Sequence, residues 1–153
     1  MNSKERLGLS GRLTITLTGP DGAVKDQREL KNLIVNAGLA YITSRMLGTS
    51  LAAMSHMGLG SGSTAAAAGD TNLGALIGSR KVLGSATQSG SNNESIVFTT
   101  VFEPGEATGA VTEAGIFNAA TSGTMLCRTV FPVVNKQSGD TLQVTWTVTL
   151  SAA

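Results

Sequence analysis

TLQVTWTVTL, which runs from Thr141 to Leu150, alternates apolar and polar side chains over its whole length. The apolar series is Leu, Val, Trp, Val and Leu, and the other series is threonine with one glutamine. A period of two with many β-branched residues is typical of a strand with one buried face. The stretch therefore predicts a half-buried strand, with Trp146 as a core anchor rather than a surface for stacking nucleic-acid bases, which needs neighbouring aromatic and basic residues.

A second alternating stretch, Arg12–Gly19, carries leucine and isoleucine on one face and threonine on the other. Residues 20–22 (Pro-Asp-Gly) have turn chemistry, because proline fixes φ and glycine accepts positive φ. Val24–Leu30 is charged and predicts the returning strand, which Leu33–Val35 extends. The beginning of the chain is therefore expected to form a hairpin.

One helix is predicted over Ala37–Leu47, with Asn36 as its N-cap and Gly48 as its C-terminal stop. Within it, three apolar residues recur at helical spacing and form one stripe, which we expect to pack against a sheet: Leu39, Ile42 and Met46.

Most of the remaining chain has the patterns of short strands and turns. In this region we predict strands at His56–Gly60, Arg80–Leu83 and Ser95–Glu103, and a hairpin of Val111–Asn118 with Thr124–Val134. Asp70 is expected to cap a short helical turn, and the Ser/Gly/Asn-rich stretch Gly84–Asn93 is expected to be an exposed loop.

These elements predict a mainly β fold, an antiparallel β-sandwich with one short α-helix near 37–47 and with a jelly roll as one of its forms. The length of 153 residues fits a single domain, 1–153. Ten of the 21 charged residues fall within residues 1–31. We therefore interpret the charged hairpin at residues 1–30 as an arm that could attach the protein to a neighbour.

The glycine-rich stretch at residues 56–74, HMGLGSGSTAAAAGDTNLG, resembles a nucleotide-binding loop only superficially. A Walker-type loop needs a lysine, which GLGSGST lacks. A dinucleotide fingerprint needs a third glycine where the chain has Ser63, or Ala65 in the other register. We interpret Gly58 and Gly60 as glycines of a sharp turn or a close approach.

Residues that could carry catalysis or bind metal are scarce. The only histidine, His56, has no nucleophile motif with it and is interpreted as a structural or surface histidine. The only cysteine, Cys127, lies in an apolar run and is interpreted as a small core residue. One histidine and one cysteine do not make a zinc site. We therefore predict no catalytic, cofactor-binding or metal-binding residue, no cofactor and no enzyme activity.

Glu113 and Arg128 form the one candidate ion pair. If the hairpin pairs symmetrically about its AATSG loop, these residues face each other across it. A cross-strand pair of this type contributes roughly 0.2–1 kcal/mol, so its expected role is structural.

The net charge is +1 and only 14% of the residues are charged, so no clustered basic face for nucleic acid is expected. No apolar run is long enough to span a membrane, and Met1–Ser10 lacks the apolar stretch of a signal peptide. We expect synthesis in a host cytoplasm, with neither nucleic acid nor membrane as a partner.

Several phrases together resemble a family of small virion proteins of tailed bacteriophages. They are KNLIVNAGLAYITSRML, MSHMGLGSGSTAAAAGDTNLGAL, VTEAGIFNAATSGTMLCRTVFPVVNK and DTLQVTWTVTL, and they span roughly residues 31–150. The resemblance implies a β-sandwich structural component that decorates or cements a capsid. It also implies the major capsid protein or neighbouring virion proteins as partners and a place on the capsid exterior.

Two alternatives remain open at this stage. A tail, fibre or baseplate adaptor of the same virion fits the same resemblance, and a carbohydrate-binding module for host attachment would need an exposed aromatic platform. In each case a homo-oligomer is expected, because closed symmetric assemblies are common.

Overall fold

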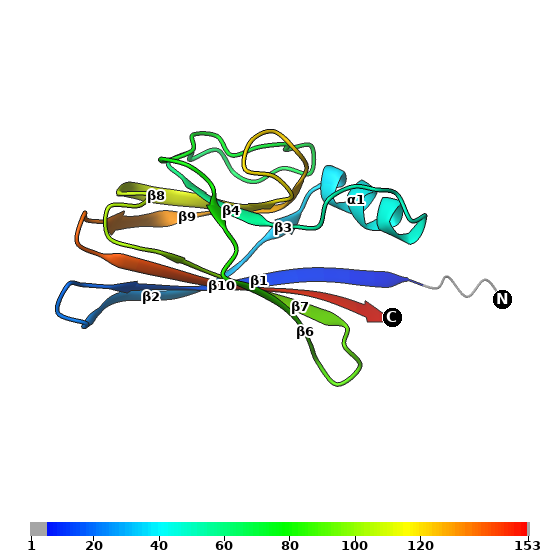
Figure 1. Ribbon diagram of the computed structural model, residues 1–153, viewed down its shortest axis with the longest axis horizontal. Coiled ribbons are helices and arrows are strands. Elements are labelled where there is room, and N and C mark those ends of the chain that lie inside the picture. The colour runs from blue at the N-terminus through cyan, green and yellow to red at the C-terminus, as the bar shows by residue number, and fades with distance from the viewer. Residues whose placement is uncertain (1–5, 153) are drawn as a thin grey trace.

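The computed structural model describes residues 6–152 and contains two antiparallel sheets that pack face to face (Figure 1). Sheet A is built from β1 (Leu7–Thr18), β2 (Val24–Lys31), β6 (Ser85–Ser89), β7 (Ser95–Phe102) and β10 (Thr141–Ala152). Sheet B is built from β3 (Leu33–Ile34), β4 (His56–Gly60), β5 (Lys81–Val82), β8 (Gly109–Phe117) and β9 (Met125–Lys136). A single helix, α1 (Asn36–Met46), connects β3 to β4. The predicted antiparallel β-sandwich with one short helix is confirmed.

The strand order is β2-β1-β10-β7-β6 in sheet A and β3-β9-β8-β4-β5 in sheet B. Neighbouring strands of the sequence pair as hairpins within a sheet, namely β1 with β2, β6 with β7 and β8 with β9. The other pairs join strands that lie far apart in the sequence, such as β1 with β10 and β4 with β8.

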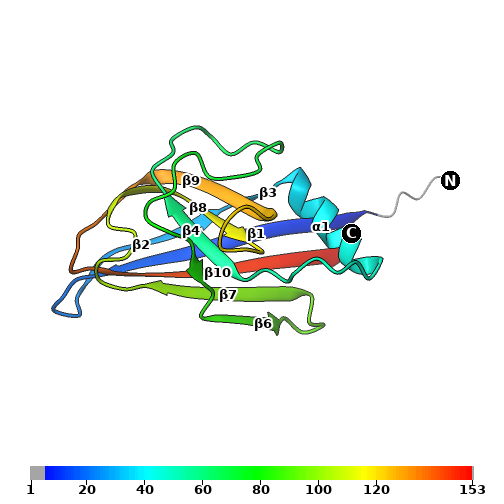
Figure 2. The ribbon, with the colours of Figure 1, turned by 45° about the horizontal axis from the view of Figure 1, so that its top comes forward.

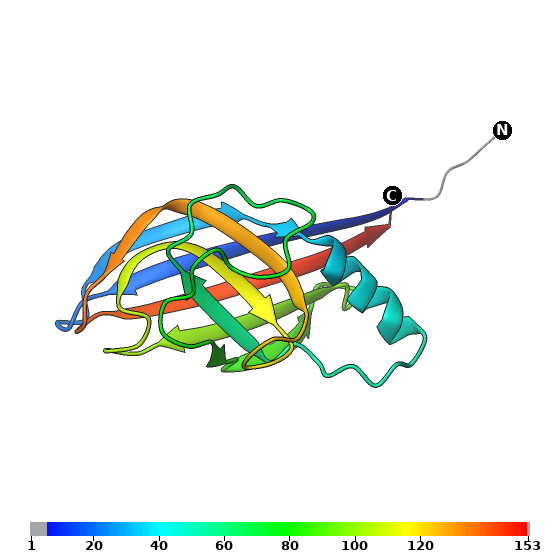
Figure 3. The same cartoon turned by 90° about the horizontal axis from the view of Figure 1, so that it is seen from above.

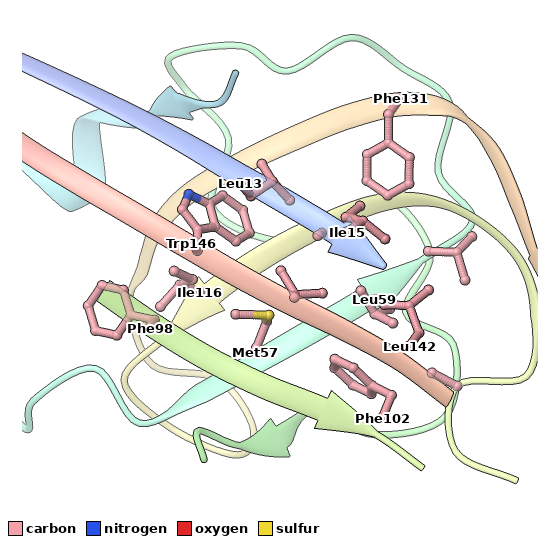
Figure 4. Close-up of a cluster of buried hydrophobic side chains, with 14 of the residues drawn as sticks. Leu13, Ile15, Met57, Leu59, Phe98, Phe102, Ile116, Phe131, Leu142 and Trp146 are labelled. Atoms are coloured by element: carbon pink, nitrogen blue, oxygen red, sulfur yellow. The ribbon is translucent and has the colours of Figure 1, made fainter. Parts of the chain in front are cut away.

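The two alternating stretches form neighbouring strands at the centre of sheet A. In the register of β1 with β10, Leu13 lies opposite Trp146 and Thr14 lies opposite Thr145, so apolar and threonine faces coincide. The apolar face is buried and meets side chains from sheet B such as Met57 and Ile116 (Figure 4). The threonine face is the half-exposed outer face of the sandwich.

The charged beginning of the chain is part of the fold. Residues 1–5 of the predicted arm lie outside the described residues, but β1 is paired on both sides, with β10 and β2. The predicted extension Leu33–Val35 is wrong as a continuation of β2, because Leu33 and Ile34 pair with β9 in sheet B. The chain thus crosses from one sheet to the other at Asn32.

The helix has nearly the predicted bounds but not the predicted cap or packing. Its N-cap is Val35 without a side-chain hydrogen bond, so the assignment of Asn36 as N-cap is wrong. The buried helical residue is Gly38, where an added Cβ would lie 2.2 Å from the carbonyl oxygen of Leu126 in β9. The expected stripe is largely uncovered, because Leu39 and Met46 remain 45% and 83% exposed. The close backbone contact at Gly38 therefore holds α1 against sheet B, and of the stripe only Ile42 packs against the main core.

The prediction of an exposed loop over Gly84–Asn93 is wrong in part. Ser85–Ser89 forms β6, which pairs with β7 at the edge of sheet A. Every residue of β6 is exposed, so the strand is held by backbone pairing and has no buried face.

The segment between β4 and β5 covers the outer face of sheet B and forms a partial third layer (Figures 1 and 2). A small second core lies beneath it and includes Leu73, Phe117 and Met125. This segment contains the glycine-rich stretch singled out from the sequence.

Candidate functional site

The predicted ion pair of Glu113 and Arg128 exists, but its geometry differs from the expectation. In the register of β8 with β9, Glu113 lies opposite Val130, because bulges shift the pairing along the hairpin. The Arg128 guanidinium reaches diagonally instead, with Nη2 2.9 Å from Oε2 of Glu113. Glu113 is 0% and Arg128 3% exposed, so the predicted cross-strand pair is a buried one.

The Glu113 carboxylate is also the anchor of the glycine-rich segment. Its Oε1 accepts hydrogen bonds from the backbone N–H groups of Gly62 (2.9 Å) and Ala75 (2.8 Å), and its Oε2 accepts one from Gly74 (2.9 Å). A Cβ at Gly62 would lie 2.5 Å from Oε1, so a side chain there would displace the carboxylate. A Cβ at Gly60 would collide with the same carboxylate, so Gly60 allows a close approach, as predicted, and what approaches is a carboxylate of the same chain.

Arg128 joins this anchor to a second carboxylate. Its Nη1 lies 2.7 Å from Oδ2 of Asp70, and its Nη2 donates to the carbonyl oxygen of Thr64 over 3.0 Å. Asp70 also accepts a hydrogen bond from the N–H of Ala67. Asp70 therefore closes a turn and binds Arg128, and the prediction that it caps a helical turn is wrong. We call Glu113, Arg128 and Asp70 the loop-anchoring cluster.

The charges of the loop-anchoring cluster stabilise one another. Burial raises the pKa of Glu113, but the N–H groups of Ala75, Gly74 and Gly62 together with Arg128 outweigh it, so the pKa is lowered overall. The hydrogen bond from Ala67, followed by Arg128, lowers the pKa of Asp70. Burial alone would lower the pKa of Arg128, but its bonds to both carboxylates raise it. All three groups are engaged with their own chain, and the arrangement serves to fix the loop.

Arg80 fixes the far end of the same segment. Its guanidinium stacks over the ring of Phe117 at 3.4 Å from the centroid and donates to the carbonyl oxygens of Ala119 and Ser122. A cation over an aromatic face is a favourable electrostatic contact. Arg80 therefore ties the covering segment to the loop of the β8–β9 hairpin.

A second polar cluster lies where β9 turns into β10. The Lys136 side chain is 1% exposed, and its Nζ donates to the carbonyl oxygens of Glu103 and Asp140. Asp140 in turn accepts hydrogen bonds from Lys25 Nζ (2.8 Å) and Gln137 N–H (2.9 Å). The position of Asp140 three residues after Gln137 is the one signal in the sequence that could have indicated the hydrogen bond between them.

His56 lies in β4 and is hydrogen-bonded to its neighbour in sequence, with Nδ1 2.8 Å from Oγ of Ser55. Within residues 6–152, no carboxylate is hydrogen-bonded to this histidine. Cys127 is fully buried, and burial raises the pKa of its thiol. Trp146 is 0% exposed, so both core assignments are confirmed.

An apolar groove lies at the α1 end of the sandwich. It has a volume of about 300 Å³ and is bounded by Tyr41 and Ile42 of α1, by Met54, and by sheet A residues that include Ile96 and Leu150. No charged side chain is among the residues of the described chain that line it. Sequence reasoning missed this groove, because it predicted that the α1 stripe would close against the sheet.

Two further searches of residues 6–152 gave no candidate site. No group of three or more His, Cys, Asp or Glu side chains is placed to hold a metal ion. Among the described helices, none has the length and apolar character needed to cross a membrane.

Comparisons of the chain with models of protein families, with curated proteins and with solved structures found no match.

Proposed function

We propose that this chain is a structural component of a tailed-bacteriophage virion that decorates the capsid and stabilises it through protein–protein contacts. The resemblance of residues 31–150 to small virion proteins directs the proposal to a phage particle. The fold contributes a rigid sandwich whose loops are tied down by buried charge networks.

The observation that carries the proposal is the uncovered apolar surface at the α1 end. Besides Leu39 and Met46, the chain exposes Leu47 (85%) and Leu51 (42%) directly after the helix. Met46 lines a second hollow that shares Tyr41, Ile42, Ile96 and Leu150 with the groove. Leu47 and Leu51 follow Met46 in the chain, so apolar side chains gather at this end of the molecule. Contiguous exposed apolar patches on soluble proteins mark interaction surfaces.

The outer face of sheet A supports the same role. Its central strands present threonine, which is uncharged and β-branched. Burying a neutral hydroxyl surface against a neighbour costs less than stripping water from charges. A contact made only in the assembled shell stabilises that shell, because a ligand that binds one state alone favours it.

The alternative of a carbohydrate-binding module loses its main support. Such a module needs an exposed aromatic platform, but Trp146 and the four phenylalanines are each at most 4% exposed. Tyr41 remains half-buried at the groove, with its hydroxyl donating to the carbonyl oxygen of Ala52.

The test uses particles prepared with and without this protein and follows the release of DNA on heating. Particles that lack the protein should release DNA at a lower temperature, and adding the purified chain should restore the original value. Leu47→Asp should fail to restore it. Val24→Asp should succeed, because Val24 is 59% exposed but lies in the β1–β2 hairpin at the opposite end (Figure 1).

Equal heat stability with and without the protein would contradict cementing. The copy number per particle then distinguishes decoration from the adaptor role. Decoration requires many copies over the shell, whereas a few copies at one vertex would indicate a tail, fibre or baseplate adaptor.

A further inference from the structure

The four edge strands in the described part of the two sheets differ in how they are protected. β2 carries five charged residues among its eight, which discourages pairing with another chain. β3 and β5 have only two residues each. β6 has five residues with the sequence SATQS, without a charge, a proline or a bulge, and all five are exposed. Of these four edge strands, β6 alone has none of the features that normally prevent another strand from pairing with a sheet edge.

The open edge borders the apolar groove. Ala86 and Gln88 lie opposite Phe98 and Ile96 in the register of β6 with β7, so they share the face that points toward sheet B. All four of these residues line the groove. α1 and the chain that follows it lie over the ends of β6 and β7 in Figure 3, and the groove lies between them. A strand added to β6 would therefore direct alternate side chains toward the groove and the others toward solvent.

We propose that β6 and the groove together bind an extended segment of a different protein, uncharged and apolar at alternate positions, which adds a strand to sheet A. This inference rests on the proposed function, since it names the contact through which the chain holds its neighbour. Backbone pairing supplies the hydrogen bonds, and the groove selects the side chains. The absence of charge from both β6 and the groove lining matches an uncharged occupant.

The interface area also requires both features. A standard interface takes about 800 Å² from each partner, which is close to a tenth of the 8241 Å² surface of the described chain. The edge of β6 is only about 17 Å long at ~3.4 Å per residue. Strand pairing alone therefore covers too little surface, and side chains that enter the groove must contribute the rest.

A second copy of this chain does not fit the site. Its own β6 would offer only Ala86 and Gln88 on the groove side, which are too small or too polar to fill about 300 Å³. Its β2 is charged, and its β3 and β5 are too short to pair with five residues. Residues 1–6 carry Lys4, Glu5 and Arg6, so they do not match an apolar groove either.

The test titrates the full-length, isotope-labelled chain with a synthetic peptide, Ser-Leu-Thr-Leu-Thr-Leu-Ser, which carries a Gly-Gly-Lys-Lys tail for solubility. A control peptide has the same composition with its three leucines adjacent. We expect the alternating peptide to bind and to slow amide hydrogen exchange in residues 85–89, and we expect the control peptide to bind far more weakly.

Two variants of β6 place the same new charge on opposite faces of the strand. Gln88→Lys puts an ammonium at the groove and should weaken binding about tenfold or more. Ser85→Lys lies on the outer face, at a position that does not line the groove, and should change the affinity by less than about threefold. Both positions are exposed, so both variants should keep the native amide spectrum.

The proposal is overturned if the alternating peptide does not bind, if the control peptide binds equally well, or if the two lysine variants weaken binding equally. It is also overturned if the unmodified chain dimerises in solution and Gln88→Lys abolishes the dimer, because the occupant is then a second copy. None of these results depends on the heat stability of particles, so the proposed function and this contact can fail separately.

Discussion

Glu113→Gln is the substitution that tests most directly whether the loop-anchoring cluster holds the covering segment in place. The carboxylate presents two acceptor oxygens to four partners: Gly62 and Ala75 at Oε1, and Gly74 and Arg128 at Oε2. A glutamine amide keeps the shape but offers one oxygen and one donor group. In either orientation, two donors then face an N–H₂ group and lose their acceptor.

The expected cost follows from those lost partners. Each buried donor left without an acceptor costs about 1–3 kcal/mol, and breaking a buried ion pair from one side costs about 3–5 kcal/mol. Arg128 keeps its bond to Asp70, and the segment can open to water, so the cost stays near the sum for two donors. We expect Glu113→Gln to lower the free energy of unfolding by about 3–5 kcal/mol.

The assay is equilibrium unfolding in urea followed by the fluorescence of Trp146, the single tryptophan and a fully buried one. Glu29→Gln is the matched control, because Glu29 pairs with Arg12 at 2.8 Å but the two side chains are 59% and 70% exposed. That variant should lose no more than about 1 kcal/mol. Equal losses in the two variants would show that the buried cluster does not hold the segment.

The difference in unfolding free energy between the native chain and Glu113→Gln should depend on pH. The pKa of Glu113 is lower in the folded chain than its ordinary value of 4.5, so the unfolded chain binds the proton more readily. The stability that Glu113 contributes is therefore fully present above pH 4.5 and is lost as the pH falls through the lower folded value. The difference in unfolding free energy between the native chain and Glu113→Gln should shrink below pH 4.5, and a constant difference down to pH 3 would contradict this origin.

Two further predictions concern the helix and the thiol. Gly38→Ala should lower the melting temperature and increase amide exchange in α1, because its Cβ would lie 2.2 Å from the Leu126 carbonyl oxygen. Gly69→Ala should have little effect, because a Cβ at Gly69 would meet nothing within 4 Å. Equal melting temperatures of the two variants would show that the close contact is not needed. Cys127 should resist alkylation by iodoacetamide in the native chain and react in urea, because burial raises the pKa of its thiol; rapid native labelling, measured by mass spectrometry, would show that the site opens.

The strands that could be predicted are those with one buried face. Alternation of apolar and polar residues predicts β1 and β10, because a strand with one buried face requires a period of two. β6 buries neither face, so its sequence carries no such period and resembles a loop. Its pairing with β7 depends on backbone hydrogen bonds, and these place little constraint on which side chains the strand carries.

Only the contact within one hairpin, between Glu113 and Arg128, could be predicted for the candidate site. The pairing of Glu113 with Arg128 follows from a hairpin that the sequence shows, although the bulges after Val111 and Ile116 displace the register and could not be seen. The link from Arg128 to Asp70 spans 58 residues and depends on how a segment without strands folds back over sheet B. Glycine spacing indicates that something approaches closely, and it does not say which group approaches.

The helix stripe was misjudged for a reason that bears on the proposed contact. A stripe of Leu39, Ile42 and Met46 predicts burial, because apolar surface exposed to water is unfavourable. In this chain α1 contacts β9 closely at Gly38, Ile42 lines the groove and packs against the main core, and Leu39 and Met46 stay exposed. The apolar surface that the fold leaves uncovered is the surface that a partner can cover.

That arrangement fixes the character of binding at this end of the molecule. The groove and β6 contain no charge, whereas the charged residues of β2 lie on the opposite edge of sheet A. Binding that depends on apolar burial and backbone pairing is little affected by the screening of charges. Kosmotropic salts strengthen apolar burial, so an occupant of the groove should be held as well or better in sulfate. A contact through the charged β2 edge would instead weaken as ionic strength rises, and the direction of the salt dependence therefore identifies which edge of the sheet meets the neighbour.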